Sequence, residues 1–412
     1  MKILIVGAGA AGMMAAATIA ESNSDASVII VEKNTILGRK VIISGGGRCN
    51  LTTADNDMHS LIRAYPRGSR WLKFCMHEFS PIDVYEWFEN HGIHLKTEGM
   101  KIFPQSNKGT DVTDMFERLF YKHGVNILLK TAVEKISKNG NGFKMYFKDG
   151  GSMDCDKLIL TTGGHAYSHT GSTGDGYTFA KALGHNIKPL ASTLTSFGSP
   201  EEWISSLAGV SLLDAKFKLF GAEKHEISGP FLFTHTGISG PGIFALSSLS
   251  AFEKCSKQHP LKLFIDFVPN LSYEALTAEL NNKFAQSPQK SFLKVVNEYL
   301  PKSLLSIIFE RIKVDCLKVA SEISKKDLTR FIESLKNFEM ILDERTSGSE
   351  IVTAGGVDLK EVDQKTMESK ICPGLYFGGE LLDIDGFTGG YNLQSAWATG
   401  RLAGLSAVGE EI

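Results

Sequence analysis

Apolar and polar positions change their spacing along the chain, and these changes divide it into three parts. Near the N-terminus, short apolar runs at 2–6 and 27–31 flank a helical stretch at 13–20, which predicts two buried strands around a helix. Residues 215–220 alternate between apolar and polar side chains, as a half-buried strand does. Farther on, apolar residues recur every three or four positions and predict helices at 273–284, 292–299, 303–311 and 326–337. The pattern predicts an α/β protein whose middle is first β-rich and then helical.

The distribution of glycine supports the same division. Glycine accounts for 41 of the 412 residues, about 10% against an average near 7%. The glycines cluster at 7–12, 38–47, 163–176, 355–356, 378–379 and 386–390, and become sparse between 190 and 350. At about 150 residues per domain, two or three domains are expected. We predict one glycine-rich domain built from 1–190 and 351–412. The domain inserted at 191–350 should be β-rich over 191–270 and helical over 271–340.

Charge and cysteine content narrow the classes of function. Lys and Arg number 44 and Asp and Glu number 46, a net charge of −2, and this balance argues against a nucleic-acid partner. No apolar run reaches the roughly 18 residues of a membrane span. The six cysteines are far apart and form neither a metal motif nor a disulfide framework, so we expect reduced thiols, no metal and a cytoplasmic protein.

The first glycine cluster carries a dinucleotide-binding pattern. The apolar run 2–6 leads into Gly7-Ala8-Gly9-Ala10-Ala11-Gly12, and a helix follows at once. Gly7 suits a tight turn, Gly9 lets a pyrophosphate approach the backbone, and Gly12 lets the helix pack on the strand. Glu32, with Lys33 beside it, stands 20 residues past Gly12, where an acid accepts hydrogen bonds from ribose hydroxyls. A small-residue packing turn is the alternative, and the motif alone leaves FAD and NAD both open.

A second cluster follows the second strand. Polar side chains surround three consecutive glycines, and the candidate binding residues are Arg39, Lys40, Ser44, Gly45, Gly47, Arg48, Cys49 and Asn50. Such a loop lets backbone approach a phosphate or a flat ring. An exposed hairpin is the alternative. Arg48 could lower the pKa of the Cys49 thiol, but a packing or cofactor-contact role is favoured for this cysteine because no second cysteine is near.

A third cluster follows an apolar strand at 157–160, which ends in Thr161-Thr162-Gly163-Gly164 and should lie on the adenosine side of a cofactor. The strands before it, at 131–137, 143–147 and 151–155, predict a β-meander, whose Val133 could meet the adenine. Thr173 and Asp175 open a further helix.

The C-terminal clusters point to flavin. A strand at 374–377 ends near Gly379, Glu380 and Asp383, and both acids are candidates for the ribityl hydroxyls. Gly390, Tyr391, Asn392 and Leu393 open the last helix, whose N-terminus would stabilise negative charge on a reduced flavin ring. A glycine-rich helix cap is the alternative for this segment alone. Taken together, the four segments favour a single FAD held between the two ends of the chain.

Several motifs resemble one known family. They are the runs 38–40, 44–50, 353–357, 366–370 and 389–394, together with Phe233 to Pro241 and Ile102-Phe103-Pro104. In this combination the chain resembles the BaiN/YhiN-like FAD-dependent oxidoreductases, which include aminoacetone oxidase family proteins and dehydro-bile-acid reductases. The resemblance covers nearly the whole chain. It implies a two-dinucleotide-binding-type FAD domain with an inserted β-barrel-like and helical domain.

The chemistry is then that of flavin, with the protein supplying orientation and exclusion of water. NAD(P)H is the hypothesised hydride donor. Because no second Gly-x-Gly-x-x-Gly marks a separate nicotinamide domain, this donor would bind transiently and meet the flavin face directly. The leading hypothesis is reduction of an activated C=C bond in a small apolar substrate. The alternatives are an amine oxidase, and a flavin-binding protein that acts in RNA modification. His165, His169 and His235 are weak candidates for acid–base catalysis, and the oligomeric state is not predicted.

Overall fold

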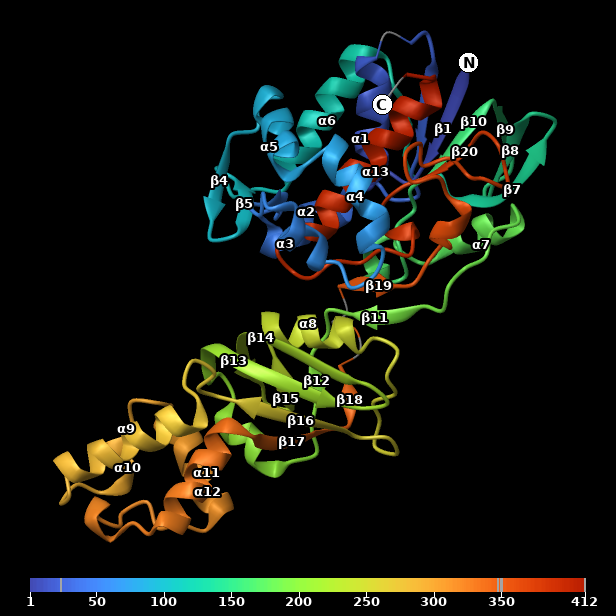
Figure 1. The fold of residues 1–412 in the computed structure, drawn as a ribbon. Coiled ribbons are helices and arrows are strands. Elements are labelled where there is room, and N and C mark those ends of the chain that lie inside the picture. Colours follow the sequence, from blue (N-terminus) through green and yellow to red (C-terminus); the bar gives the residue numbers. More distant parts are fainter. Residues whose placement is uncertain (23, 347, 349–350, 411–412) are drawn as a thin grey trace. The chain divides into compact units, whose positions relative to one another are not determined.

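The computed structural model describes residues 1–22, 24–346, 348 and 351–410. The chain divides into two compact units, Met1–Ser192 with Ile351–Ile412, and Thr193–Glu350. Within the first unit, segments from the two ends of the chain lie side by side, the blue helix α1 beside the red helix α13 (Figure 1). None of the helices in the described residues combines the length and the apolar character that crossing a membrane requires.

The first unit is built on a five-stranded sheet in the order β20-β10-β1-β2-β6, whose neighbours all pair in parallel. The strands are β1 (Lys2–Val6), β2 (Ser27–Val31), β6 (Asn126–Leu128), β10 (Lys157–Leu160) and β20 (Leu375–Phe377). Parallel sheets have both faces covered and therefore read as apolar runs. That is why 2–6 and 27–31 could be recognised as strands, and the α/β class is confirmed.

Helices α1 (Ala10–Glu21) and α13 (Tyr391–Val408) pack against each other and give the sheet its central cover. Their close approach depends on glycine. A Cβ at Gly400 would lie 2.3 Å from the backbone oxygen of Ala11, and one at Gly404 would lie 2.7 Å from that of Ala15. The other helices of this unit are α2 (Arg39–Gly47), α3 (Met58–Arg63), α4 (Ser69–Glu78), α5 (Pro81–Asn90), α6 (Thr110–His123) and α7 (Asp175–Ala182).

Smaller sheets complete the first unit. The predicted meander is present as β7 (Val133–Asn139), β8 (Gly142–Phe147) and β9 (Ser152–Cys155). A second antiparallel sheet contains β3 (Thr52–Thr53), β5 (Lys101–Pro104) and β4 (Leu95–Glu98). The chain leaves this unit along β11 (Ala191–Thr193) and returns along β19 (Val352–Ala354), and these two strands pair with each other.

The second unit contains a seven-stranded sheet in the order β17-β16-β13-β14-β15-β12-β18. Its strands are β12 (Phe197–Gly198), β13 (Ser211–Phe220), β14 (Lys224–Phe233), β15 (Gly237–Ser239), β16 (Leu261–Asp266), β17 (Phe338–Leu342) and β18 (Glu344–Arg345). The two edge strands, β17 and β18, are separated by the single residue Asp343. The sheet must therefore curl until its edges meet, which gives the barrel-like form expected from the resemblance.

The helices of the second unit are α8 (Pro241–Leu249), α9 (Tyr273–Gln286), α10 (Phe292–Val296), α11 (Lys302–Ile312) and α12 (Lys325–Lys336). Ser272 and Ser324 cap α9 and α12 through their side-chain oxygens. Phe292, Phe309 and Phe331 pack ring on ring with centroids 4.9–5.2 Å apart, and the same apolar core continues into the sheet. The helical part thus shares one core with the barrel-like sheet.

Candidate cofactor site

The glycine-rich turns of the first unit meet at the carboxyl edge of its parallel sheet. Gly7 N donates to Val31 O at 2.9 Å, Thr161 N to Val6 O at 2.9 Å, and Gly378 N to Leu160 O at 3.1 Å. These bonds bring the ends of β2, β1 and β10 to one line. We call the turns 7–12, 161–164 and 378–383, together with 39–50 and 389–393, the cradle. Ligands of open parallel sheets bind at this edge.

The first turn has the geometry that a pyrophosphate requires. Gly7 has φ +99°, and a Cβ there would lie 2.6 Å from Thr161 O, so the turn excludes larger residues. At Gly12 a Cβ would lie 2.0 Å from Gly7 O. A Cβ at Gly9, by contrast, would meet no heavy atom within 4 Å. Gly9 precedes α1, whose first residues are the buried Ala10 and Ala11, so the space beside it faces the free N–H groups of a helix N-terminus.

Glu32 stands where the sequence placed a ribose-binding acid. Its carboxylate accepts hydrogen bonds from Ala8 N and Asn34 N, both at 2.8 Å, which fix it beside the first turn. Thr131 N donates to Glu32 O at 2.9 Å and so brings the start of the meander, with the buried Val133, next to it. This neighbourhood is consistent with the adenosine side predicted for Glu32 and Val133.

The second cluster differs in part from the expected loop. Helix α2 extends to Gly47, but Ser44 is extended and Gly45 and Gly46 have left-handed backbone, so the regular helix ends before Ser44. The Ser44 hydroxyl donates to Val41 O at 2.8 Å. A Cβ at Gly46 or Gly47 would meet nothing within 4 Å. The triple glycine therefore forms an open bend.

The residues after this bend contact the start of the last helix. With its side-chain amide oriented to satisfy both neighbours, Asn50 accepts from Gly390 N at 2.9 Å and donates to Thr52 O at 3.3 Å. Gly390 has φ +96°, and a Cβ there would lie 2.2 Å from Thr52 O. The start of α13 is thus held against the 50–52 segment, although the two are more than 300 residues apart in the sequence.

Arg48 and Cys49 have structural contacts. The Arg48 guanidinium pairs with Glu98 at 2.8 Å and lies 4.0 Å from the Phe103 ring centroid. Cys49 has φ +60° and is fully buried, and its burial raises the thiol pKa to about 12. The thiol is therefore protonated at neutral pH, which supports the packing role and opposes a reactive one.

Two ion pairs join predicted site residues that are distant in the sequence. Lys33 Nζ lies 2.6 Å from Asp175 and also contacts the Thr173 hydroxyl. Lys40 Nζ lies 2.6 Å from Glu380 Oε2, and Glu380 Oε1 accepts from Thr353 N at 2.8 Å. Thr353 was not among the predicted site residues. Its motif was recognised, but only the folded chain shows it beside the end of β20.

The remaining predicted residues occupy several positions around the cradle. Gly379 N donates to the Thr399 hydroxyl at 2.9 Å, and the Asn392 amide bonds Gly386 N and O, both at 2.8 Å. Burial raises the pKa of the Asp383 carboxyl. Thr162 has a buried hydroxyl oxygen without a partner among the described residues. The other predicted positions here are Arg39, Gly163, Gly164, Tyr391 and Leu393, which lie on these same turns.

The candidate histidines are all exposed. His165 follows Gly164, and its backbone N donates to Thr353 Oγ1 at 2.8 Å, so it lies at the rim of the cradle. The His169 ring lies 4.8 Å from that of Tyr167. His235 lies in the second unit, between β14 and β15.

A buried ion pair near α13 was missed. Arg67 forms a two-point contact with Asp385, whose side chain is fully buried, and Tyr65 donates to Tyr391 O at 2.7 Å. These contacts fix the segment that leads into α13. Because 318 residues separate Arg67 from Asp385, no local pattern could reveal the pair.

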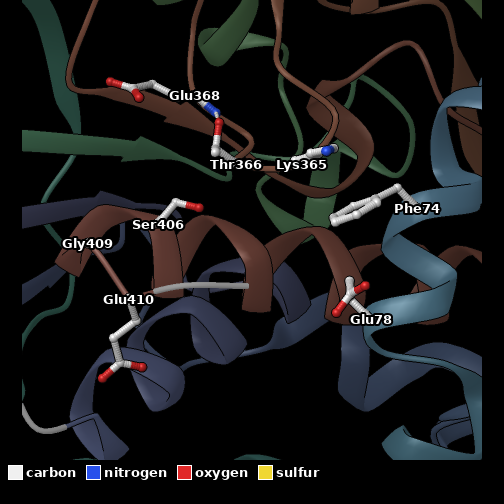
Figure 2. A pocket seen from close by; sticks show the side chains of 8 residues that line it. All are labelled: Phe74, Glu78, Lys365, Thr366, Glu368, Ser406, Gly409 and Glu410. Carbon is white, nitrogen blue, oxygen red and sulfur yellow. Dashed lines mark hydrogen bonds between the residues drawn. The ribbon is translucent and has the colours of Figure 1, made fainter.

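The surface of the first unit also has a pocket of about 510 Å³, which Figure 2 shows. Its lining includes Phe74, Glu78, Lys365, Thr366, Glu368, Ser406, Gly409 and Glu410. The pocket lies at the C-terminal end of α13, whereas the cradle lies at its N-terminal end. Eighteen helical residues span about 27 Å, so the pocket is not part of the cradle.

Comparison with known proteins decides the family. The sequence profile of the HI0933-like protein Rossmann domain matches residues 1–406. The chain belongs to this family. It is 32% identical over 410 residues to the 3-dehydro-bile acid delta(4,6)-reductase of Clostridium scindens, with 98% of both chains covered. It is 30% identical to the ribosomal RNA dihydrouridine synthase of Haemophilus influenzae, covering 98% of this chain and 97% of that protein.

A solved structure supports the fold. The 3-ketosteroid-delta4-(5alpha)-dehydrogenase of Rhodococcus jostii aligns with a TM-score of 0.53 at 13% identity, covering 99% of this chain and 96% of that one. The resemblance to BaiN-like oxidoreductases is confirmed, and this family member is an FAD-dependent oxidoreductase. The cradle fits FAD, because Gly9, Gly46 and Gly47 leave open space beside backbone and the Thr162 hydroxyl lacks a protein partner among the described residues.

Proposed function

We propose that this protein takes hydride from NAD(P)H and reduces a C=C bond conjugated with a carbonyl group in a small apolar substrate. Two observations support this proposal: the cradle of the first unit, which fits FAD, and the 32% identity to a protein named as a delta(4,6)-reductase of a 3-dehydro-bile acid. The donor has no dinucleotide motif of its own in the sequence. It would therefore react at the same flavin face as the substrate, one after the other.

Reduction of such a bond adds a hydride to the carbon β to the carbonyl and a proton to the α carbon. Bound FAD supplies the hydride chemistry. The chain must supply or relay the proton and exclude water. His165 is the strongest candidate in the first unit, because its backbone N is fixed by Thr353 Oγ1 at 2.8 Å and its imidazole is exposed at the cradle rim.

Anaerobic stopped-flow absorbance tests both half-reactions. NADH or NADPH should bleach the oxidised flavin, and 4-androstene-3,17-dione or a 4,6-dien-3-one steroid should restore its absorbance. His165→Phe should slow reoxidation and leave bleaching unchanged, with His123→Phe, at the exposed end of α6, as the matched control. Failure of both nicotinamides to bleach the flavin would exclude the donor, and failure of every enone to reoxidise it would exclude the substrate class.

A second candidate is uridine in RNA, whose C5=C6 bond is also conjugated with a carbonyl. A relative named as a ribosomal RNA dihydrouridine synthase motivates it. The distribution of charge adds a structural reason, because residues 283–330 contain ten Lys or Arg and five Asp or Glu, whereas the whole chain has a net charge of −2. Among the described side chains, these exposed lysines have no carboxylate within 4.0 Å: Lys290, Lys294, Lys302, Lys313, Lys325 and Lys326. Unpaired cations of this kind suit phosphate contacts.

Mass spectrometry separates the two candidates. Reduced enzyme is incubated in parallel with an unmodified ribosomal RNA transcript and with an enone steroid, and each product is examined for the gain of two hydrogens. Dihydrouridine with no steroid product would replace the first candidate by the second. The charge-reversal variant Lys325→Glu/Lys326→Glu should then lose RNA turnover while flavin bleaching by nicotinamide is unchanged.

A further inference from the structure

One carboxylate, that of Glu380, connects three segments of the first unit. Its Oε2 lies 2.6 Å from Lys40 Nζ at the start of α2, and its Oε1 accepts from Thr353 N in β19 at 2.8 Å. Glu380 itself belongs to the turn after β20. The side chain is 16% exposed, so it is largely withdrawn from water and depends on these two donors for compensation.

Close packing holds Glu380 in place. A Cβ at Gly164 would lie 2.8 Å from Glu380 Oε1 and 2.6 Å from Thr353 Oγ1. Thr353 is 3% exposed, and its hydroxyl accepts from His165 N at 2.8 Å. The Glu380 carboxylate is therefore confined to its present position. Two hydrogen bonds fix β19 to this part of the unit, one from Thr353 N to Glu380 and one from His165 N to the Thr353 hydroxyl.

The Lys40 ammonium is held by Glu380 but keeps hydrogen-bond donors for a further acceptor. A lysine ammonium has three donors, and Lys40 has one acceptor, Glu380, within the described part of the chain. The Lys40 side chain is 27% exposed. A long flexible side chain loses entropy when it is fixed on a ligand, and prior fixation by Glu380 removes that cost from binding.

We propose that Glu380 is a positioning residue: it presents the Lys40 ammonium to an anionic part of FAD and ties the returning strand β19 to the occupied cradle. The anionic part is either the pyrophosphate or the reduced flavin ring. The proposal concerns the cofactor alone and does not depend on the electron donor or the substrate. It also predicts that FAD binding protects the backbone of β19, because the Thr353 amide donates to the same carboxylate.

The test uses the full-length protein stripped of FAD and then titrated with it. Lys40→Met removes the ammonium, Glu380→Gln keeps an acceptor for Thr353 N but removes the charge, and Lys40→Arg keeps the charge. Lys40→Met and Glu380→Gln should each raise the FAD dissociation constant on the order of 10- to 100-fold, the loss expected for one charge-assisted hydrogen bond. The double variant should be no worse than Lys40→Met, and Lys40→Arg should stay close to the wild type.

A matched control is Lys216→Met, because Lys216 pairs with Glu226 at 2.5 Å in the second unit and not in the cradle. Its FAD affinity should equal that of the wild type. Hydrogen exchange at residues 352–354 should slow when FAD binds to the wild type and should slow less in Glu380→Gln. The flavin midpoint potential distinguishes the two anionic groups: it should fall in Lys40→Met if the ammonium faces the reduced ring, and stay constant if it faces the pyrophosphate.

Two results would overturn the proposal. The first is additive losses in the double variant with a mild Lys40→Met effect, which would mean that Glu380 contacts FAD directly. The second is exchange at 352–354 that is indifferent to FAD in the wild type. If Glu380→Gln fails to fold, the comparison of Lys40→Met with Lys40→Arg still decides whether the ammonium acts on FAD.

Discussion

Gly9 and Gly12 stand in one turn but should respond to the same substitution in opposite ways. A methyl group at Gly9 meets no heavy atom within 4 Å, and its backbone angles, φ −78° and ψ −171°, are open to alanine. A methyl group at Gly12 would lie 2.0 Å from the backbone oxygen of Gly7. We predict that Gly9→Ala loses FAD while keeping the apo fold, and that Gly12→Ala damages the fold itself.

The magnitudes follow from opposing effects. Replacing a glycine by alanine stiffens the unfolded chain and stabilises by about 0.4–1 kcal/mol, whereas alanine is a poorer helix N-cap than glycine by about 0.5–1 kcal/mol. The free energy of unfolding of apo Gly9→Ala should therefore change by less than about 1 kcal/mol. For Gly12→Ala, a backbone clash of this depth should cost about 1–3 kcal/mol or more.

The effect on FAD comes from the space that Gly9 leaves open. A methyl group there keeps phosphates from the backbone N–H groups at the start of α1, and each lost charge-assisted bond is worth about 1.5–3 kcal/mol. Gly9→Ala should thus weaken FAD binding about 10- to 100-fold and reduce the thermal stabilisation that FAD confers. Urea unfolding of the apo proteins and flavin fluorescence titrations measure the two quantities separately. Wild-type FAD affinity in Gly9→Ala, or equal loss of apo stability in both variants, would refute the assignment of Gly9 to the cofactor.

Three further predictions concern other parts of the fold. Burial lowers the pKa of His185 below its ordinary 6.5, so the unfolded chain binds the proton more readily than the folded one. Stability that is present at neutral pH is therefore lost as the pH falls from about 6.5 toward the lowered pKa. The urea midpoints at pH 7 and pH 5 should differ less in His185→Gln than in the wild type, and an unchanged difference would contradict this. Because burial raises the pKa of Cys49 to about 12, native protein at pH 8 should leave Cys49 unlabelled by a thiol reagent, and peptide mapping that finds it modified would disprove its burial. Gly400→Ala brings a methyl group 2.3 Å from the Ala11 oxygen and should lower the free energy of unfolding by about 1–3 kcal/mol, whereas wild-type stability would show that α1 and α13 can separate.

The sequence predicted the elements whose periodicity is local. The strands at 2–6 and 27–31 agree with the structure to the residue, and the helix predicted at 303–311 is α11 with one more residue at each end. Buried parallel strands can be recognised within a few residues because both of their faces are covered, which makes them apolar runs. Amphipathic helices can be recognised because one face is buried, which repeats apolar residues every three or four positions. The helix expected at 292–299 ends at Val296. Apolar spacing continues past that point, and only the tertiary contacts settle where the helix stops.

The sequence predicted which segments form the cofactor site, but not which residues contact one another in and around the cradle. Glycine clusters marked which turns would approach a ligand, but the partners of Lys40 and Arg67 lie 340 and 318 residues away in the sequence. No periodicity links such positions. For Arg48, adjacency in the sequence was misleading. Its position next to Cys49 suggested an effect on the thiol pKa, whereas its guanidinium pairs with Glu98. Burial, which a single sequence reveals poorly for one residue in a loop, decides the pKa of that thiol.

The net charge of the chain is a weak guide to a polyanionic partner, because a phosphate responds to charges within about 8 Å at physiological salt. Summed over all 412 residues the net charge is −2, but residues 283–330 carry +5, so the remainder of the chain carries −7. This segment belongs to the helical part of the second unit, and its helices α11 and α12 begin with Lys302 and Lys325. Lysine opposes the positive end of a helix dipole at these positions, so neither residue is explained by helix stability. The uneven distribution therefore removes the main argument from composition against RNA, and the choice between the two proposed substrates rests on which of them the reduced enzyme turns over.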